Sequence, residues 1–248
     1  MRIAALYDIH GNLFALDAVL AELGEIRPDA ILVGGDVAAG PFPAETLDRL
    51  TSLDADVRFI RGNADREVAW PSEDASVWAE RARWAHGRLT PTGCDFLARL
   101  AERMILEVDG IGPTLFCHGS PRSDEEIITA LTVDERLREI LAGVEQHLVV
   151  GGHTHMQLDR RVDDVRFVNA GSIGLPYEET PGAYWTLLGP GVERRHTSYD
   201  LARAADAMRA SGYPGADEFV EKLLLAPPRP AEVAARFEKM ALERAARR

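Results

Sequence analysis

Four short motifs in this chain are made of residue types that bind metal ions. They are Asp8-Ile9-His10-Gly11-Asn12, Gly35-Asp36, Gly62-Asn63 and Gly152-His153-Thr154-His155. Each follows an apolar run rich in β-branched residues, and the carboxyl ends of parallel strands deliver side chains into the ligand crevice of an α/β sheet. Two divalent cations held there would suit phosphoryl chemistry, because they lower the pKa of water and neutralise charge on the attacked oxygens.

The residue types indicate a role for each motif. Asp8 and His10 are two residues apart, so in extended geometry both side chains leave the same side of the backbone and can hold one ion. Asp36 has two carboxylate oxygens, which make it the natural bridge between two cations. Asn63 offers a neutral carbonyl oxygen that would leave its ion more Lewis-acidic. The set of seven predicted ligands is completed by His118, His153 and His155.

The series of four motifs is stronger evidence for a metal site than any one motif alone. A lone histidine after a strand is more often a hydrogen-bonded structural residue than a metal ligand. The repeated placement at strand ends is what favours a metal site here. Asn12 has two interpretations: it orients a phosphate, as a third catalytic candidate beside Asp36 and Asn63, or it caps the following helix.

Composition limits the class of protein. The chain has 248 residues, 46% of them hydrophobic, which is enough for one large domain with a full core. Its net charge of −12 disfavours an extended nucleic-acid surface and fits a small phosphate-ester substrate. The two cysteines cannot form a disulfide framework, and no apolar stretch approaches the roughly 20 residues that span a bilayer. The first motif leaves no room for a removable signal peptide, so we expect a cytoplasmic protein without a membrane partner.

The elements that must position the motifs change along the chain. Strands over residues 3–7, 30–33 and 57–60 alternate with helices over about 12–23 and 44–53, which predicts a parallel sheet. Residues 75–100 read as two helices separated near Thr90-Pro91. The following strands are predicted over 104–108, 114–117, 147–150, 157–162, 165–169, 183–188 and 192–197. Two sheets packed face to face with helices outside would satisfy both halves.

The last 50 or so residues have a different character. Residues 202–210, 216–224 and 231–247 are helical in composition, with Pro227-Pro228-Arg229-Pro230 as a stiff break. We therefore expect a main domain over 1–198 and a helical extension over 199–248. Val233, Phe237 and Met240 form an apolar stripe that must pack on the domain, which is favoured, or on another copy in a homo-oligomer.

The metal-ligand series resembles that of the calcineurin-like metallophosphoesterase superfamily over roughly residues 1–197. The stretch Asn169-Ala170-Gly171-Ser172 is also similar to the Asn-Pro-Gly-Ser stretch of its small bacterial and archaeal phosphodiesterases, with Ala170 where proline is usual. The resemblance implies an α/β fold, a four-layer α/β-β/α sandwich of two mixed sheets with flanking helices, here with a C-terminal helical tail.

The resemblance also implies the ligand sets and the metals. The first ion would be held by Asp8, His10, Asp36 and His155, and the second by Asp36, Asn63, His118 and His153. Two divalent ions are expected, with manganese favoured over iron, zinc or nickel. The implied reaction is hydrolysis of a phosphodiester or a nucleotide-type phosphoanhydride by a metal-bridging hydroxide.

Two departures from the family pattern narrow the range of activities that the resemblance implies. Ala64 stands where the family's phosphomonoesterases carry a histidine that protonates the leaving group, so difficult leaving groups should react poorly and a phosphomonoesterase is the weaker alternative. The sequence Val37-Ala38-Ala39 lacks the arginine that phosphoprotein phosphatases have after the second motif, which disfavours that role.

Three questions stay open at this level. Asp65 either orients Asn63 or pairs with Arg61 or Arg66. Arg122, on a polar segment after His118, is the best single candidate for a phosphate contact. The alternative to an enzyme is a metal-binding but non-catalytic interaction module of the same fold, as in the retromer subunit.

Overall fold

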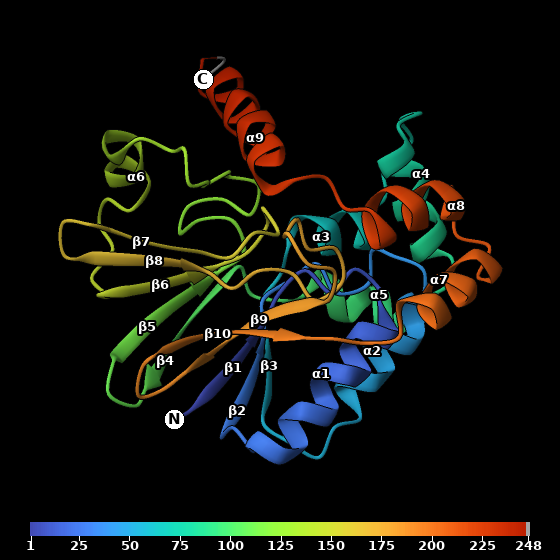
Figure 1. The fold of residues 1–248 in the computed structure, drawn as a ribbon, viewed down its shortest axis with the longest axis horizontal. Coiled ribbons are helices and arrows are strands. Elements are labelled where there is room, and N and C mark those ends of the chain that lie inside the picture. The colour runs from blue at the N-terminus through green and yellow to red at the C-terminus, as the bar shows by residue number, and fades with distance from the viewer. Residues whose placement is uncertain (247–248) are drawn as a thin grey trace.

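The computed structural model describes residues 1–246, which form two five-stranded mixed sheets (Figure 1). The first sheet has the order β10-β9-β1-β2-β3 and the second β4-β5-β6-β8-β7. The strands of the first are β1 (Ile3–Leu6), β2 (Ala30–Val33), β3 (Val57–Phe59), β9 (Ala183–Leu188) and β10 (Val192–Thr197). Those of the second are β4 (Arg103–Val108), β5 (Gly112–Cys117), β6 (Leu148–Gly151), β7 (Leu158–Val162) and β8 (Val165–Asn169).

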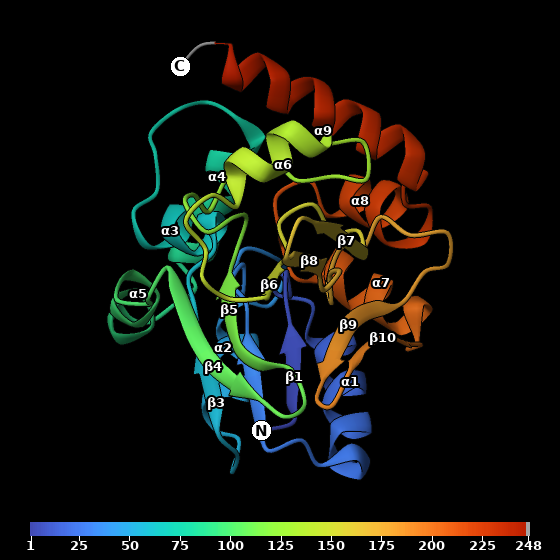
Figure 2. The same cartoon turned by 90° about the vertical axis from the view of Figure 1, so that its left-hand side faces the viewer.

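The sheets face each other across one hydrophobic core. Ile3 and Ala5 of β1 point into this core with Phe116 of β5 and Val150 of β6. The alternate side chains of β1 face the opposite way, where the first sheet is covered by α1 (Leu13–Ile26) and α2 (Pro43–Thr51). The outer face of the second sheet packs on α6 (Asp134–Ile140) (Figures 1 and 2). The predicted four-layer sandwich of mixed sheets is confirmed.

Strand register brings the motif loops to one edge of the sandwich. Strands β1, β2 and β3 run parallel, with Leu6 opposite Val33 and Val33 opposite Phe59. Their carboxyl ends are therefore level. Strands β5 and β6 are parallel to each other as well. The loops after β1 and β2 are joined directly, since the amide of His10 donates to the carbonyl of Asp36 at 2.8 Å.

Two short helices were absent from the sequence prediction. Helix α3 (Asn63–Ala69) begins at a predicted metal ligand, and α6 contains only seven residues. Both are too short to show a clear helical period. The two helices predicted between residues 75 and 100 are confirmed as α4 (Val77–His86) and α5 (Pro91–Ala98).

The C-terminal helices pack on the rest of this chain. They are α7 (Leu201–Ala210), α8 (Ala216–Phe219), the π-helical segment η1 (Val220–Leu225) and α9 (Pro230–Ala245). The predicted last helix extended to Arg247, which lies outside the described residues. In Figure 2, α9 crosses above α6. Val233 of the predicted stripe is buried, and Phe237 contacts Tyr177 with 6.1 Å between ring centroids.

Within residues 1–246, no helix is both long and apolar enough to cross a membrane.

The attachment of α9 should depend on Glu238. Its carboxylate accepts hydrogen bonds from the hydroxyls of Thr129 and Thr132 at 2.9 and 2.8 Å and from Arg136 at 3.1 Å. We expect Glu238→Ala to lower the free energy of unfolding by about 2–3 kcal/mol, because it removes the ionic partner of a mostly buried guanidinium and the acceptor of two hydroxyl groups. Urea unfolding measures this change.

Glu243→Ala, on the same helix, is the matched control. Its carboxylate is exposed and lies 4.0 Å from Lys239, so its removal should change stability by less than about 0.5 kcal/mol. Equal effects of the two substitutions would contradict the role given to Glu238.

Candidate metal centre

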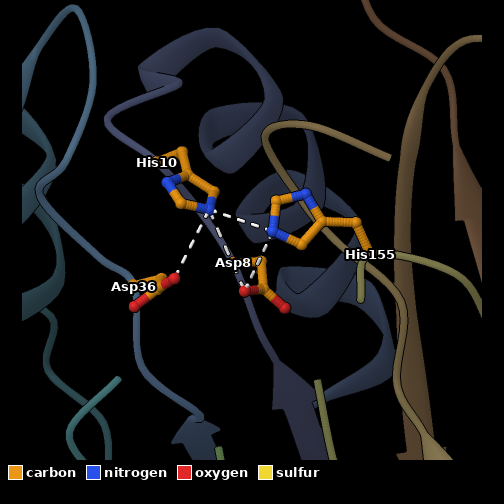
Figure 3. A group of neighbouring side chains, drawn as sticks. All are labelled: Asp8, His10, Asp36 and His155. Carbon is orange, nitrogen blue, oxygen red and sulfur yellow. Dashed lines mark hydrogen bonds and ion pairs between the residues drawn. The ribbon is translucent and has the colours of Figure 1, made fainter. Parts of the chain in front are cut away.

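Six of the seven predicted ligands meet in two overlapping groups. The first contains Asp8, His10, Asp36 and His155, and the second Asp36, His118 and His153. Within each group, one potential ligand atom from every residue lies within 4.8 Å of the others. Figure 3 shows the first group, in which the imidazoles of His10 and His155 face the two carboxylates. Asp36 belongs to both groups, as a bridging residue must.

Backbone carbonyls fix the orientation of three histidines. The Nδ1 atoms of His10, His118 and His155 lie 3.2, 2.9 and 2.8 Å from the carbonyls of Ala39, Gly34 and Leu175. Because a carbonyl only accepts, each Nδ1 carries the proton, and a neutral ring presents the lone pair of Nε2 to the cluster. The Nε2 atoms of His10 and His155 are 3.1 Å apart, which suits two donors to a shared cation.

Each carboxylate has one oxygen held by the backbone and one facing the cluster. Asp8 Oδ2 accepts from the amide of His153 at 2.9 Å, and Asp36 Oδ1 accepts from the amide of Ala64 at 2.7 Å. Asp36 Oδ2 lies 3.6 Å from His10 Nε2 and 3.3 Å from His118 Nε2. Of the two Asp36 oxygens, Oδ2 therefore faces both groups while Oδ1 is bonded to the backbone, whereas the sequence suggested that both oxygens would be available to cations.

Whether the candidate ligands fit a metal ion can be judged from the buried polar atoms that have no partner within the protein. Among the described residues, five buried side-chain atoms form no hydrogen bond, namely Asp8 Oδ1, Asn63 Oδ1, His118 Nε2, Thr46 Oγ1 and Arg61 Nε. An unsatisfied buried polar atom costs about 1–3 kcal/mol, more when it is charged. Three of the five belong to residues that the sequence nominated as ligands. The oxygen and imidazole donors thus fit divalent cations.

The carboxylates draw positive charge into the cluster. Burial alone would lower the pKa of His118, but Asp36 and Asp8 outweigh it and raise this pKa to about 10. Burial and the charge on His118 lower the pKa of His153 to about 4. Burial would raise the pKa of Asp36, yet His118 holds it well below its usual range. The cluster therefore favours positive charge, supplied either by a proton or by a metal cation. Metal binding should consequently release protons.

Five of the ligand residues have left-handed backbone conformations. Their φ angles are 53° for Asp8, 47° for His10, 54° for Asp36, 68° for His153 and 59° for His155. Such conformations cost roughly 1–3 kcal/mol each in non-glycine residues and persist only where the surroundings impose them. The strain is concentrated at the ends of the strands that supply the ligands.

Asp65 links the second and third motifs through backbone amides. Its Oδ2 accepts from Asp36 at 2.8 Å and Gly62 at 3.0 Å, and its Oδ1 accepts from Val37 at 2.8 Å. Burial and the charge on Asp36 raise its pKa to about 6. The suggested pairing of Asp65 with an arginine is wrong, because Arg61 bonds Glu102 and Arg66 bonds Asp124 and Glu125.

Two predicted substrate contacts lie elsewhere in the structure. Asn12 caps α1, since its Oδ1 accepts from the amide of Ala15 and its Nδ2 donates to Gly174 and Tyr199. This buried side chain has no donor left for a phosphate. Arg122 bonds Glu126 and the carbonyl of Glu139, and it does not line the cavity at the cluster. Neither residue is retained as a phosphate contact.

A cavity of about 510 Å³ opens onto the cluster. Although Phe237 and Met240 belong to the predicted apolar stripe, its walls include residues from α3, α4, α8 and α9 that the sequence did not place at the site. These are Glu67, Trp78, Arg81, Phe219, Arg236, Phe237 and Met240, with Tyr177 and Tyr213 from the connecting segments. Tyr177 stacks on His155, with 5.3 Å between ring centroids. Tyr177 also had a local signal, since it follows shortly after the Asn169–Ser172 stretch.

Comparison with known proteins adds a family and a fold. The family model of the calcineurin-like phosphoesterase superfamily domain matches residues 1–188. A hypothetical protein from Pyrococcus horikoshii OT3 has a similar structure, with a TM-score of 0.80 and 22% identity over 92% of this chain and 99% of that one. A metallophosphoesterase from Sphaerobacter thermophilus gives 0.73 and 26% over 89% and 97%. No curated protein matches the sequence.

Metal binding should require glycine at position 62. A Cβ there would lie 2.1 Å from Asp36 Oδ1 and 2.5 Å from the Asp36 amide nitrogen. We expect Gly62→Ala to displace this carboxylate and weaken manganese binding by at least about tenfold, because even changes around the ligands have effects of that size. Calorimetric titration of metal-stripped protein measures the affinity.

Gly191→Ala is the control, since a Cβ at that position meets no atom within 4 Å. It should bind manganese as the wild type does. Wild-type affinity in a folded Gly62→Ala protein would show that the close approach of Gly62 to Asp36 is dispensable.

Proposed function

The chain belongs to the calcineurin-like phosphoesterase superfamily, and from this membership and the site geometry we propose that it hydrolyses a phosphodiester or a nucleotide-type phosphoanhydride in a metal-dependent reaction. The observation that carries the proposal is the set of buried ligand atoms without a protein partner, Asp8 Oδ1, Asn63 Oδ1 and His118 Nε2. The similarly folded Sphaerobacter protein is described as a metallophosphoesterase, which supports the same activity here.

We assign one ion to Asp8, His10, Asp36 and His155 and a second to Asp36, Asn63, His118 and His153. Manganese is the proposed metal, because carboxylate, amide and imidazole donors suit it. When bound, the cations would supply Lewis acidity toward the phosphate and lower the pKa of water.

The protein groups act by holding positions. The amide of Ala64 fixes one oxygen of Asp36 and so directs the other toward both groups of ligands. Carbonyls behind His10, His118 and His155 prevent the rings from turning. A site that is rigid before substrate binds needs little reorganisation during the reaction.

The leaving group determines which esters react. Ala64 lies on the cavity wall and has no group that transfers a proton to a departing oxygen. Leaving groups that are stable as anions, such as an aryl oxide or the phosphate released from an anhydride, are therefore favoured over alkoxides.

Turnover by metal-loaded protein tests the proposal. Protein stripped of metal and reloaded with manganese should hydrolyse bis(p-nitrophenyl) phosphate faster than p-nitrophenyl phosphate, as followed by nitrophenolate absorbance. Asp36→Asn should abolish this activity and weaken the binding of both ions. Absence of metal-dependent hydrolysis of either ester would reject the enzyme and favour a non-catalytic metal-binding module.

Restoring a proton donor should extend the range of leaving groups. Because Ala64 lines the cavity, Ala64→His places an imidazole there. We expect turnover of phenyl phosphodiesters to rise by roughly 100-fold, the lower end of general-acid catalysis. Esters of p-nitrophenol should gain far less, since that leaving group needs no proton. An equal gain for both would contradict this account of Ala64.

A further inference from the structure

Arg81, in α4, is a mostly buried cation that forms no ion pair among residues 1–246. Its side chain lines the cavity, the residue is 7% exposed, and its Nε donates to the carbonyl of Pro214 at 3.2 Å. Within residues 1–246 its Nη1 and Nη2 donate no hydrogen bond, and because neither is among the fully buried unsatisfied atoms, both remain accessible from the cavity. Burying a guanidinium is costly unless an anion and hydrogen bonds compensate for its lost hydration.

A shortage of carboxylates does not explain why Arg81 lacks an ion pair. The chain has 40 acidic residues against 28 lysines and arginines. Other arginines of the chain are paired, such as Arg66 with Asp124 and Arg136 with Glu238, and neither of these two lines the cavity. Arg81 differs from them in keeping its terminal nitrogens unpaired on the cavity wall.

Aromatic rings hold the Arg81 guanidinium in place. Its Cζ lies 5.1 Å from the ring centre of Trp78, 5.3 Å from that of Tyr213 and 5.7 Å from that of Phe219. Cation–π contacts offset part of the cost of burial and leave the Nη atoms free to donate. The same three rings line the cavity, whose volume falls within the range of about 300–1,000 Å³ typical of small-molecule sites.

Arg236, in α9, is a second cation on the cavity wall. It stacks on Phe237, with its Cζ 5.6 Å from the ring centre, and forms no ion pair among residues 1–246. Two guanidiniums that form no ion pair among residues 1–246, the mostly buried Arg81 and the exposed Arg236, therefore share one aromatic cavity with the candidate metal cluster. A ligand that matches them carries negative charge in addition to the group held by the metals, together with a flat ring.

We propose that this cavity binds a nucleotide-type phosphoanhydride. One phosphate lies at the metal cluster, Arg81 binds the neighbouring phosphate with assistance from Arg236, and the base packs on the aromatic walls. The planar guanidinium fork suits two phosphate oxygens. The inference rests on the proposed function and narrows it, because a simple phosphodiester has one charge and would leave both arginines unpaired.

Binding of a non-hydrolysable analogue tests the inference without turnover. The probes are adenosine 5′-(α,β-methylene)diphosphate and adenosine monophosphate, titrated by calorimetry into the manganese-loaded full chain. The wild type should bind the diphosphate analogue at least about tenfold more tightly than the monophosphate, as expected for one charge-assisted hydrogen bond. Arg81→Met, which keeps most of the side-chain volume, should remove this preference.

Arg244→Met is the matched control, since Arg244 lies on α9 near Glu125 and outside this cavity. It should retain the wild-type preference. If Arg81→Met fails to fold, Arg236→Gln, at an exposed position, should still reduce the preference.

Equal binding of the two probes by the wild type, or an unchanged preference in folded Arg81→Met, would overturn the inference. Either result is separate from failure of the proposed function, which appears as no metal-dependent hydrolysis of bis(p-nitrophenyl) phosphate.

Discussion

The structure depends on the burial of two carboxylates, Asp8 and Asp36, at the edge where the two sheets meet. Removing an ionised carboxylate from water costs several kcal/mol unless its oxygens are bonded. One oxygen of each accepts a backbone amide, from His153 for Asp8 and from Ala64 for Asp36. These bonds require the loops after β6 and β3 to approach closely, and a Cβ on Gly152 or Gly62 would lie 2.5 or 2.1 Å from a carboxylate oxygen.

The need to bond these two buried carboxylates also explains why the left-handed backbone conformations of the candidate ligand residues are tolerated. The ligand residues with positive φ follow parallel strands whose ladders are fixed on both sides, so the strands resist relaxation of the loops. Asp65 adds a second constraint, because three amides from two loops converge on its carboxylate. A cation bonded to the remaining oxygens and imidazole nitrogens would satisfy the atoms that the protein leaves unpaired. Fold and metal site are therefore parts of one electrostatic arrangement.

The grouping of the candidate ligands Asp8, His10, Asp36, His118, His153 and His155 was predictable from sequence because each stands shortly after a strand. A strand end is a local feature, and parallel register carries local features to a common edge. The roles of Asp65 and Asn12 were not predictable in this way. They depend on which backbone groups lie nearby in space, and the carbonyl of Gly174 that Asn12 contacts is 162 residues away. Arg81 has no local signature either, since its acceptor, Pro214, is 133 residues further along the chain.

The residues proposed to carry out the chemistry could be predicted from the sequence, whereas the residues of the cavity wall, which would select the substrate, could not. The family model ends at residue 188, whereas Tyr213, Phe219, Arg236 and Phe237 of the cavity wall follow it. Metal ligands must hold fixed positions, because small displacements of a carboxylate break its amide bond. The cavity wall needs only suitable shape and charge, and the helices that supply it attach through contacts such as Glu238 with Arg136, apart from the carboxylates. Under the proposed function, the C-terminal helices would therefore select the substrate without touching the two carboxylates, and their one aromatic link to a candidate ligand described above runs from Phe237 through Tyr177 to His155.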